Sequence, residues 1–378
     1  MQTANPFIRT LLYQPVERVP DIEFGFWDQT IRRWKREGLP SYLPETFFDP
    51  LLNEYFDMDS WPAIHIPVDY GMHPPFDEEV LEEDDRIRVS RGSDGVVRRH
   101  FKSGSDESSI PQFISYPVKT MDDFKRLQNE RYRLDAPERQ IPTAFWDEVR
   151  RKLQNPFCIV TFSGGSLYGW ARNWMGMENL AIAFHEQPPL VEAMMDMVVD
   201  LAMHGLRQVP SDIPIHFTSW WEDMCYRSGP LISPKMFREF MVPRYRTVMN
   251  EVARHGCQLA QVDCDGNIHQ LVGLWLEAGI NVMMPIEIGG GTDPFAIRKE
   301  FGKAVLMTGG VDKKSLAKGK AAIDAELDRI APLVAEGGYI PHLDHLVPPD
   351  ISLENYWYYR RQKRRLLEQL RPATHQSR

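Results

Sequence analysis

The chain has few cysteines and no long apolar run, and both deficits exclude classes of protein. Its 378 residues include four cysteines with no CxxC pair among them: Cys158, Cys225, Cys257 and Cys264. Scattered cysteines indicate free thiols in a reducing compartment, and their spacing does not suit a structural zinc site. No apolar stretch reaches the ~20 residues that a transmembrane helix needs.

Positive charge is also in short supply. Lysine and arginine total 44 against 53 aspartates and glutamates, which gives a net charge of −9. An acidic balance of this kind argues against a protein that binds nucleic acid or anionic membranes, since both ligands require many cations. The first residues carry neither a basic nor an apolar segment of a secretion signal, so we expect a cytoplasmic protein.

What the chain does have is a regular alternation of short β-rich runs with helical patterns. The alternation is clear from residue 156 onward, and two further strands fit upstream. Eight strands alternating with helices predict an α/β fold, a closed (β/α)8 TIM barrel. The predicted strands are 22–27, 63–68, 157–162, 213–220, 257–262, 280–286, 303–308 and 338–341.

One segment interrupts this alternation. Between about residues 85 and 116, two β-like runs at 86–89 and 96–99 flank the turn sequence Ser93-Asp94-Gly95. We predict a β-hairpin inserted beside the barrel mouth. The rest is expected to form one barrel domain over residues 1–371, with an N-terminal extension and a tail at 372–378.

Polar and ionisable side chains gather just past the ends of four predicted strands. The carboxyl ends of barrel strands meet at one rim, where such folds bind their ligands. We therefore expect these side chains to share one pocket. They are Glu222 and Asp223, then Asp263, Asp265 and Asn267, then Glu287, and finally His342, Asp344 and His345.

Several of these residues also have a structural alternative. Asp265 could close an Asx turn or cap the following helix. Glu222 and Asp223 are adjacent, so only one of them can point inward. Either could instead pair with Arg227. Trp27 and Tyr70 are candidates for an apolar pocket wall, with core packing as the alternative.

Several segments of the chain match the pattern of one known family, at residues 233–237, 243–245, 265–267, 309–312, 337–341, 344–345 and 354–356. On these segments the chain resembles the uroporphyrinogen decarboxylase and corrinoid-dependent methyltransferase superfamily. Together the matching segments are specific, and the resemblance spans nearly the whole chain. The family fold is an α/β barrel with its pocket at the carboxyl face, which agrees with the strand count.

The sequence departs from the decarboxylase branch of that superfamily. Those enzymes carry an arginine-rich motif after the first strand, whereas this chain has no arginine between residue 23 and Arg32. An acidic, aromatic mouth would repel a polycarboxylate substrate. Asp69 is the nearest match to the decarboxylases' aspartate after the second strand, and His345 falls at their late histidine.

The sequence departs from the zinc-dependent methyltransferases as well. They carry His-x-Cys where this chain reads Asp263-Cys264-Asp265, and a late cysteine where it has His342 to His345. The resemblance therefore implies a metal site of oxygen and imidazole ligands, Asp263, Asp265 and His345, in place of a thiolate site.

We expect an enzyme that passes a methyl group from a methoxyl or methylamine-like small molecule to cobalamin on a partner protein. A divalent metal, zinc or similar, would act as the Lewis acid. The expected catalytic residues are His345, Asp265, Glu222 and Asp69. The expected substrate-binding residues are Asp263, Asn267, Asp223, Glu287, Asp344, His342, Trp27 and Tyr70.

Two alternatives remain open. One is a cofactor-free decarboxylase of a porphyrinogen or a smaller acid, with Asp69 and His345 as its acid–base groups. The other is a corrinoid- or tetrapyrrole-binding barrel without chemistry. The resemblance also implies a homodimer.

Overall fold

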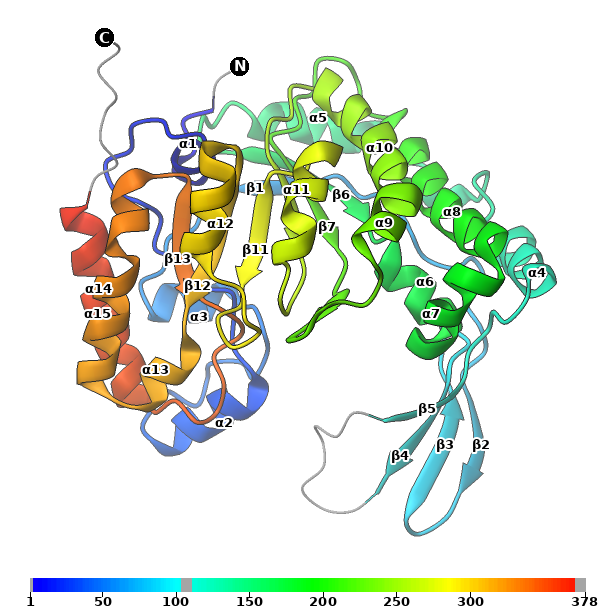
Figure 1. Cartoon of the computed structure of the whole chain (residues 1–378), viewed down its shortest axis with the longest axis horizontal. Helices are drawn as coiled ribbons and strands as arrows, with labels where there is room; N and C mark the ends of the chain where they lie inside the picture. The colour runs from blue at the N-terminus through cyan, green and yellow to red at the C-terminus, as the bar shows by residue number, and fades with distance from the viewer. Residues whose placement is uncertain (1–2, 103–110, 371–378) are drawn as a thin grey trace.

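The computed structural model describes residues 3–102 and 111–370, and a parallel β-sheet forms its centre (Figure 1). Seven strands pair in the order β1-β6-β7-β10-β11-β12-β13, every pair parallel. All residues of β12 and β13 are buried, which is why these strands read as continuous apolar runs. The strands are β1 (Ala63–His65), β6 (Ile159–Gly165), β7 (Phe217–Trp221), β10 (Ala260–Asp263), β11 (Val282–Ile286), β12 (Leu306–Val311) and β13 (Tyr339–Leu343).

The predicted α/β barrel fold is confirmed, but the predicted strand over residues 22–27 is wrong. β1 and β13 form the two edges of the sheet. The segment that should pair with β13 makes one isolated bridge, from Phe26 to Val347. The ladder therefore does not close through this segment.

A buried acid replaces the missing ladder contacts. The N–H of Leu343 donates to a carboxylate oxygen of Glu23 at 3.0 Å, where a strand would offer a backbone carbonyl. The other oxygen of Glu23 accepts from the Tyr359 hydroxyl at 2.9 Å and from Lys363 Nζ at 2.6 Å, both in the last helix. The first segment is thus joined to the barrel by ion pairing.

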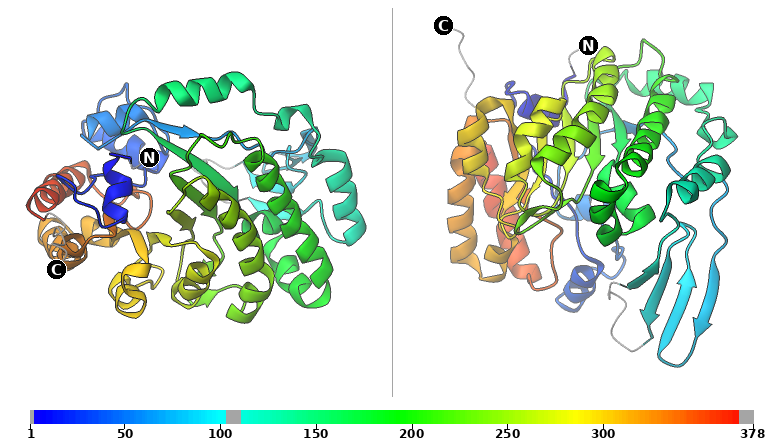
Figure 2. Two further views of the ribbon diagram at one scale, coloured as in Figure 1. Left: turned by 90° about the horizontal axis from the view of Figure 1, so that it is seen from above. Right: turned by 45° about the vertical axis from the view of Figure 1, so that its right-hand side comes forward.

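Helices surround the strands on the outside (Figure 2). Ser233 caps the helix that begins at Pro234, since its side chain accepts from the N–H of Met236, and Gly279, left-handed with φ 90°, ends the helix His269–Ala278. In the described part of the chain no helix has both the length and the apolar character needed to span a bilayer. The helices are α1 (Pro6–Leu11), α2 (Asp28–Arg36), α3 (Pro50–Tyr55), α4 (Met121–Arg131), α5 (Thr143–Lys152), α6 (Tyr168–Met175), α7 (Met177–Glu186), α8 (Pro188–Leu206), α9 (Pro234–Met236), α10 (Val242–Arg254), α11 (His269–Ala278), α12 (Pro294–Phe301), α13 (Lys313–Ala317), α14 (Lys320–Glu336) and α15 (Leu353–Gln369).

The insertion is a four-stranded antiparallel sheet, larger than the hairpin predicted from the sequence. The expected hairpin is present as β3 (Ile87–Arg91) and β4 (Val97–Phe101), flanked by β2 (Glu79–Glu83) and β5 (Gln112–Ser115). The sheet projects at the same end of the barrel as the carboxyl end of β11, opposite α1 (Figure 1). Residues 103–110 of the predicted insertion and the predicted tail at 372–378 lie outside the described residues.

Candidate functional site

Three carboxylates meet at the carboxyl ends of β7 and β10. One oxygen from each of Asp223, Asp263 and Asp265 lies within 4.8 Å of the others, and we call this group the carboxylate cluster. Asp263 and Asp265 are two residues apart, so the alternation of a strand turns them to one side. Asp263 also pairs in register with Trp221 of β7, two residues before Asp223.

The carboxylate cluster carries unbalanced negative charge. Asp263 has no hydrogen-bonding or ion-pairing partner for its carboxylate among residues 3–102 and 111–370, and burial and the neighbouring acids raise its pKa well above the ordinary value. Asp223 accepts from Trp221 Nε1 at 2.8 Å, and burial, followed by the charge of Asp265, raises its pKa too. Acids this close repel one another unless a proton or a cation binds.

His345 reaches the carboxylate cluster from the segment after β13. Its Nε2 lies 3.3 Å from Oδ2 of Asp265. The imidazole stacks on Trp27 at 6.0 Å between centroids and meets Phe24 edge-on at 5.7 Å. Burial lowers the pKa of His345, but the hydrogen bond and the charge of Asp265 outweigh burial and leave it raised. The two side chains can therefore share a proton or act together as ligands.

Glu287 and Asp344 support the loops around this site. Glu287 accepts from the N–H of Gly266 at 2.9 Å and pairs with Lys313 Nζ at 3.2 Å. Asp344 is fully buried, accepts from two N–H groups of the loop after β11 at 3.0 and 3.2 Å, and lies 3.5 Å from Lys313 Nζ. Sequence reasoning missed Lys313, although it too follows a strand end, that of β12.

Glu222 points away from the carboxylate cluster into a set of hydrogen-bond donors. It is fully buried and accepts from the N–H groups of Leu167 and Tyr168 at 3.0 and 2.7 Å. The hydroxyls of Ser166 and Tyr245 add bonds at 3.1 and 2.7 Å. Burial raises the pKa of Glu222 despite these donors, which lower it. Glu222 thus joins β7 to the start of α6, and its neighbour Asp223 faces the rim.

Asp69 and Tyr70 lie in the segment after β1. Asp69 accepts from the N–H of Gly71 at 2.7 Å, contacts His73 Nε2 and lies 3.8 Å from Arg139 Nη1. The Tyr70 hydroxyl donates to the carbonyl of Ser163 at 2.6 Å. Within the part of the chain that the structure covers, Asp69 forms no ion pair or hydrogen bond with the carboxylate cluster.

Two further predicted residues have local partners. Asn267 accepts from the N–H of His269 at 3.3 Å, so it serves the start of α11 as a helix-capping residue does. His342 is buried in β13, and its Nδ1 donates to the carbonyl of Leu343 at 2.7 Å. Burial lowers the pKa of His342 to about 4, which keeps the ring neutral near pH 7.

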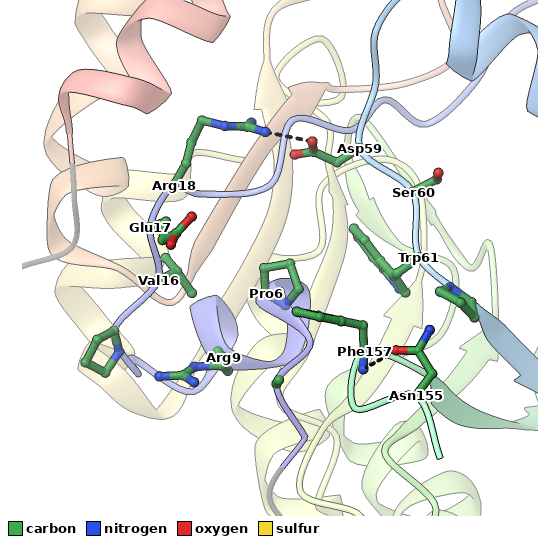
Figure 3. A pocket seen from close by; sticks show the side chains of 13 residues that line it. Pro6, Arg9, Val16, Glu17, Arg18, Asp59, Ser60, Trp61, Asn155 and Phe157 are labelled. Carbon is green, nitrogen blue, oxygen red and sulfur yellow. Dashed lines mark hydrogen bonds and ion pairs between the residues drawn. The ribbon is translucent and has the colours of Figure 1, made fainter. Parts of the chain in front are cut away.

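A cavity of about 880 Å³ lies away from the rim (Figure 3). Pro6 of α1, Arg9, Trp61 and Phe157 line it, and the last two precede β1 and β6, so it opens at the amino ends of the strands. None of the site residues predicted from the sequence lines this amino-end cavity. Size alone therefore does not mark the functional site.

The carboxylate cluster fits a divalent cation. Its three carboxylate oxygens, with the imidazole of His345 beside them, form a donor set of the type that binds Mn²⁺, Zn²⁺ or Fe²⁺. The carboxylate of Asp263, which has no partner in the described chain, gives such an ion an available ligand.

Comparison with known proteins gives a family and a fold. The family model described as Uroporphyrinogen decarboxylase (URO-D) matches residues 102–359. A solved structure of a methyltransferase from Methanosarcina mazei is similar with a TM-score of 0.53 and 14% identity, covering 95% of this chain and 97% of its own. At that identity the likeness shows the fold alone. No curated protein matches the sequence.

Proposed function

The chain belongs to the uroporphyrinogen decarboxylase family, and from that premise we propose that it is an enzyme that transfers a methyl group from a small molecule at the barrel rim. The carboxylate cluster is the observation that carries this proposal. Acids in this position repel the carboxylates of a porphyrinogen. Arg32, the first arginine after the segment 22–27, is paired with Asp28 and lies 3.6 Å from Glu45, so its charge is already matched.

A divalent metal would bind at Asp223, Asp263 and Asp265, with His345 beside them. When bound, it would supply Lewis acidity toward the methyl donor, and cobalamin on a partner protein would accept the methyl group. His345 would provide the proton. The carboxylate of Asp265 stabilises the imidazolium, and the Nε2 proton that faces this carboxylate would move to the oxygen or nitrogen that the methyl group leaves.

The supporting residues fix this geometry. Glu287 accepts from the N–H of Gly266, next to Asp265, and Asp344, next to His345 in the chain, accepts from the N–H of Ile288 in the loop after β11. Lys313 lies between these two acids, so their charges are partly compensated without involving the carboxylate cluster. The cluster is left as the negative part of the rim.

Elemental analysis tests the metal. Protein grown with Zn, Mn and Fe salts should carry a stoichiometric metal, and Asp263→Asn should lose it. The control is Asp328→Asn, since Asp328 is exposed on α14, a helix that contributes no residue to the site. Metal-free wild-type protein with full methyl-transfer activity, or a metal retained in Asp263→Asn, would contradict the proposal.

Decarboxylation of a porphyrinogen is the second candidate, favoured by the name of the matching family. In that reaction Asp69 and His345 would be the acid–base groups. The partners of Asp69, the N–H of Gly71 and the side chains of His73 and Arg139, argue for a structural role instead. Conversion of uroporphyrinogen to coproporphyrinogen in a direct assay would place this reaction first.

A further inference from the structure

A second cavity, of about 390 Å³, lies where the inserted sheet meets the barrel. It is at the carboxyl rim, because the Tyr70 hydroxyl donates at 2.6 Å to Ser163, near the end of β6. We call it the aromatic cavity. Its walls include Tyr70, Ser93, Tyr132, Trp170, Asn173 and Trp174.

The turn between β3 and β4 forms one wall, and its position is fixed. The N–H of Phe76 donates to the carbonyl of Ser93 at 3.0 Å. Gly95, with φ 77°, packs so closely on Phe76 that a Cβ would lie 2.6 Å from the ring. The guanidinium of Arg131 lies 3.8 Å from the centre of the same ring. The insertion therefore contributes a preformed surface.

Four aromatic rings form the other walls, and they pack against one another in two pairs. Tyr70 meets Trp170 edge-on at 4.6 Å, and Tyr132 meets Trp174 edge-on at 5.4 Å. Trp174 Nε1 donates to the Tyr132 hydroxyl at 3.1 Å, and the Tyr70 hydroxyl is already bonded to Ser163. Since these polar groups have partners, the rings offer mainly apolar surface to a ligand.

The aromatic cavity has polar groups at its edge but little unbalanced charge. Asn173 and Ser93 are exposed, and their side chains form no hydrogen bonds to other described residues. Among the described residues of the wall the one acid is Asp94, and it is paired with Arg98, whose Nη1 lies at 2.9 Å. A neutral ligand suits this balance better than an ion does.

Helix α6 connects the aromatic cavity to the carboxylate cluster. Trp170, Asn173 and Trp174 are spaced i, i+3, i+4 and lie on one face of α6. From the same helix, Arg172 donates to the carbonyl of Asp223 at 2.8 Å and lies 5.2 Å from the Trp221 ring. A ligand in the aromatic cavity would thus rest on the helix that contacts the acidic rim.

We infer that the aromatic cavity binds a neutral compound of one or two aromatic rings that carries a hydroxyl or ether oxygen. The volume lies in the range of small-molecule sites, ~300–1,000 Å³. Flat rings fit between edge-to-face aromatic walls, and the ligand oxygen would bond to Asn173 or Ser93. This inference concerns binding and does not depend on the reaction proposed above.

Isothermal titration calorimetry with 2-methoxyphenol tests the inference. The titration is run with a metal chelator present and with no corrinoid, so that it reports binding alone. Wild-type protein should bind it, and Ser93→Trp should abolish measurable binding by filling the aromatic cavity. The matched control is Ser60→Trp, which fills the amino-end cavity and should bind as wild type does. Asn173→Leu, at an exposed helix position, should weaken binding about fivefold through the loss of one hydrogen bond.

Cyclohexanol and 2-methoxybenzoate serve as ligand controls, because one lacks the aromatic ring and the other carries a charge. Both should bind more weakly than 2-methoxyphenol. Equal binding of the three compounds, loss of binding in Ser60→Trp alone, or unchanged affinity in both Ser93→Trp and Asn173→Leu would overturn the inference. Failure of metal binding or methyl transfer with ligand binding intact would overturn only the proposed function.

Discussion

Replacement of Glu222 by glutamine would test whether this buried acid anchors α6. One oxygen accepts from the N–H of Leu167 and the hydroxyl of Tyr245, and the other from the N–H of Tyr168 and the hydroxyl of Ser166. A glutamine amide has one oxygen and one NH2 group, so in either orientation one backbone N–H faces a donor. The hydroxyl on that side can rotate and accept from the NH2 group.

The expected cost of Glu222→Gln follows from this count. One buried N–H loses its acceptor, which costs about 1–3 kcal/mol, and the remaining bonds weaken because the acceptor is no longer charged. Removal of the buried charge offsets part of the loss, since burial raises the pKa of Glu222. We expect the free energy of unfolding to fall by about 2–4 kcal/mol.

Urea unfolding near neutral pH, followed by circular dichroism, measures this change. Tyr245→Phe removes one hydroxyl donor and should cost about 1.5–3 kcal/mol. The double variant should cost less than the sum because the two residues share a bond. Exposed Glu138→Gln is the control. If Glu222→Gln stays within about 0.5 kcal/mol of wild type, the carboxyl group is already neutral in the native protein and the reasoning fails.

The rim offers three further tests. His345 should titrate above its ordinary pKa, so the Asp265 pair stabilises the fold below the unfolded pKa and loses that contribution as pH rises through the folded one. Asp265→Asn should lower the pKa of His345 in an NMR titration, and an unchanged value contradicts the pairing. Gly266→Ala should cost about 1–3 kcal/mol in urea unfolding, because φ is 82° and the new Cβ would lie 2.6 Å from the Cys225 carbonyl oxygen; an unchanged midpoint contradicts this packing. Lys313→Met should cost about 1–3 kcal/mol by the same assay, since two acids lose their partly exposed cation, and full stability would show that the acids do not need it.

The sequence predicts the rim well because strand ends obey simple rules. Parallel strands covered on both faces must be apolar, so β10 to β13 stand out, and the polar residues after them fall at one edge. The period of two then places Asp263 and Asp265 together. The sequence does not predict which partner each side chain bonds to, because the partners come from distant parts of the chain. Glu222 faces the start of α6, a helix that the sequence pattern does not predict. Its four donors lie more than twenty positions away along the chain.

The errors have equally specific causes. The segment 22–27 has the composition of a strand, but Glu23 makes the contact to Leu343 that a ladder would make. The helices α4 to α7 were not predicted, although Thr120 and Asp123 form a capping box that signals the start of α4. Lys313 was missed because a lysine next to an apparent helix cap reads as solvent-exposed.

The ion pairs between the first segment and α15 constrain the order in which the chain can fold during synthesis. Asp21 and Glu23 have no side-chain exposure, and their cations, Arg360 and Lys363, are translated more than 330 positions later. A nascent chain that lacks α15 would have to bury two uncompensated acids, so it keeps this region open on the ribosome. We therefore expect the amino-terminal segment to pack only after α15 has been synthesised, and a copy truncated before α15 to leave that segment open to proteolysis.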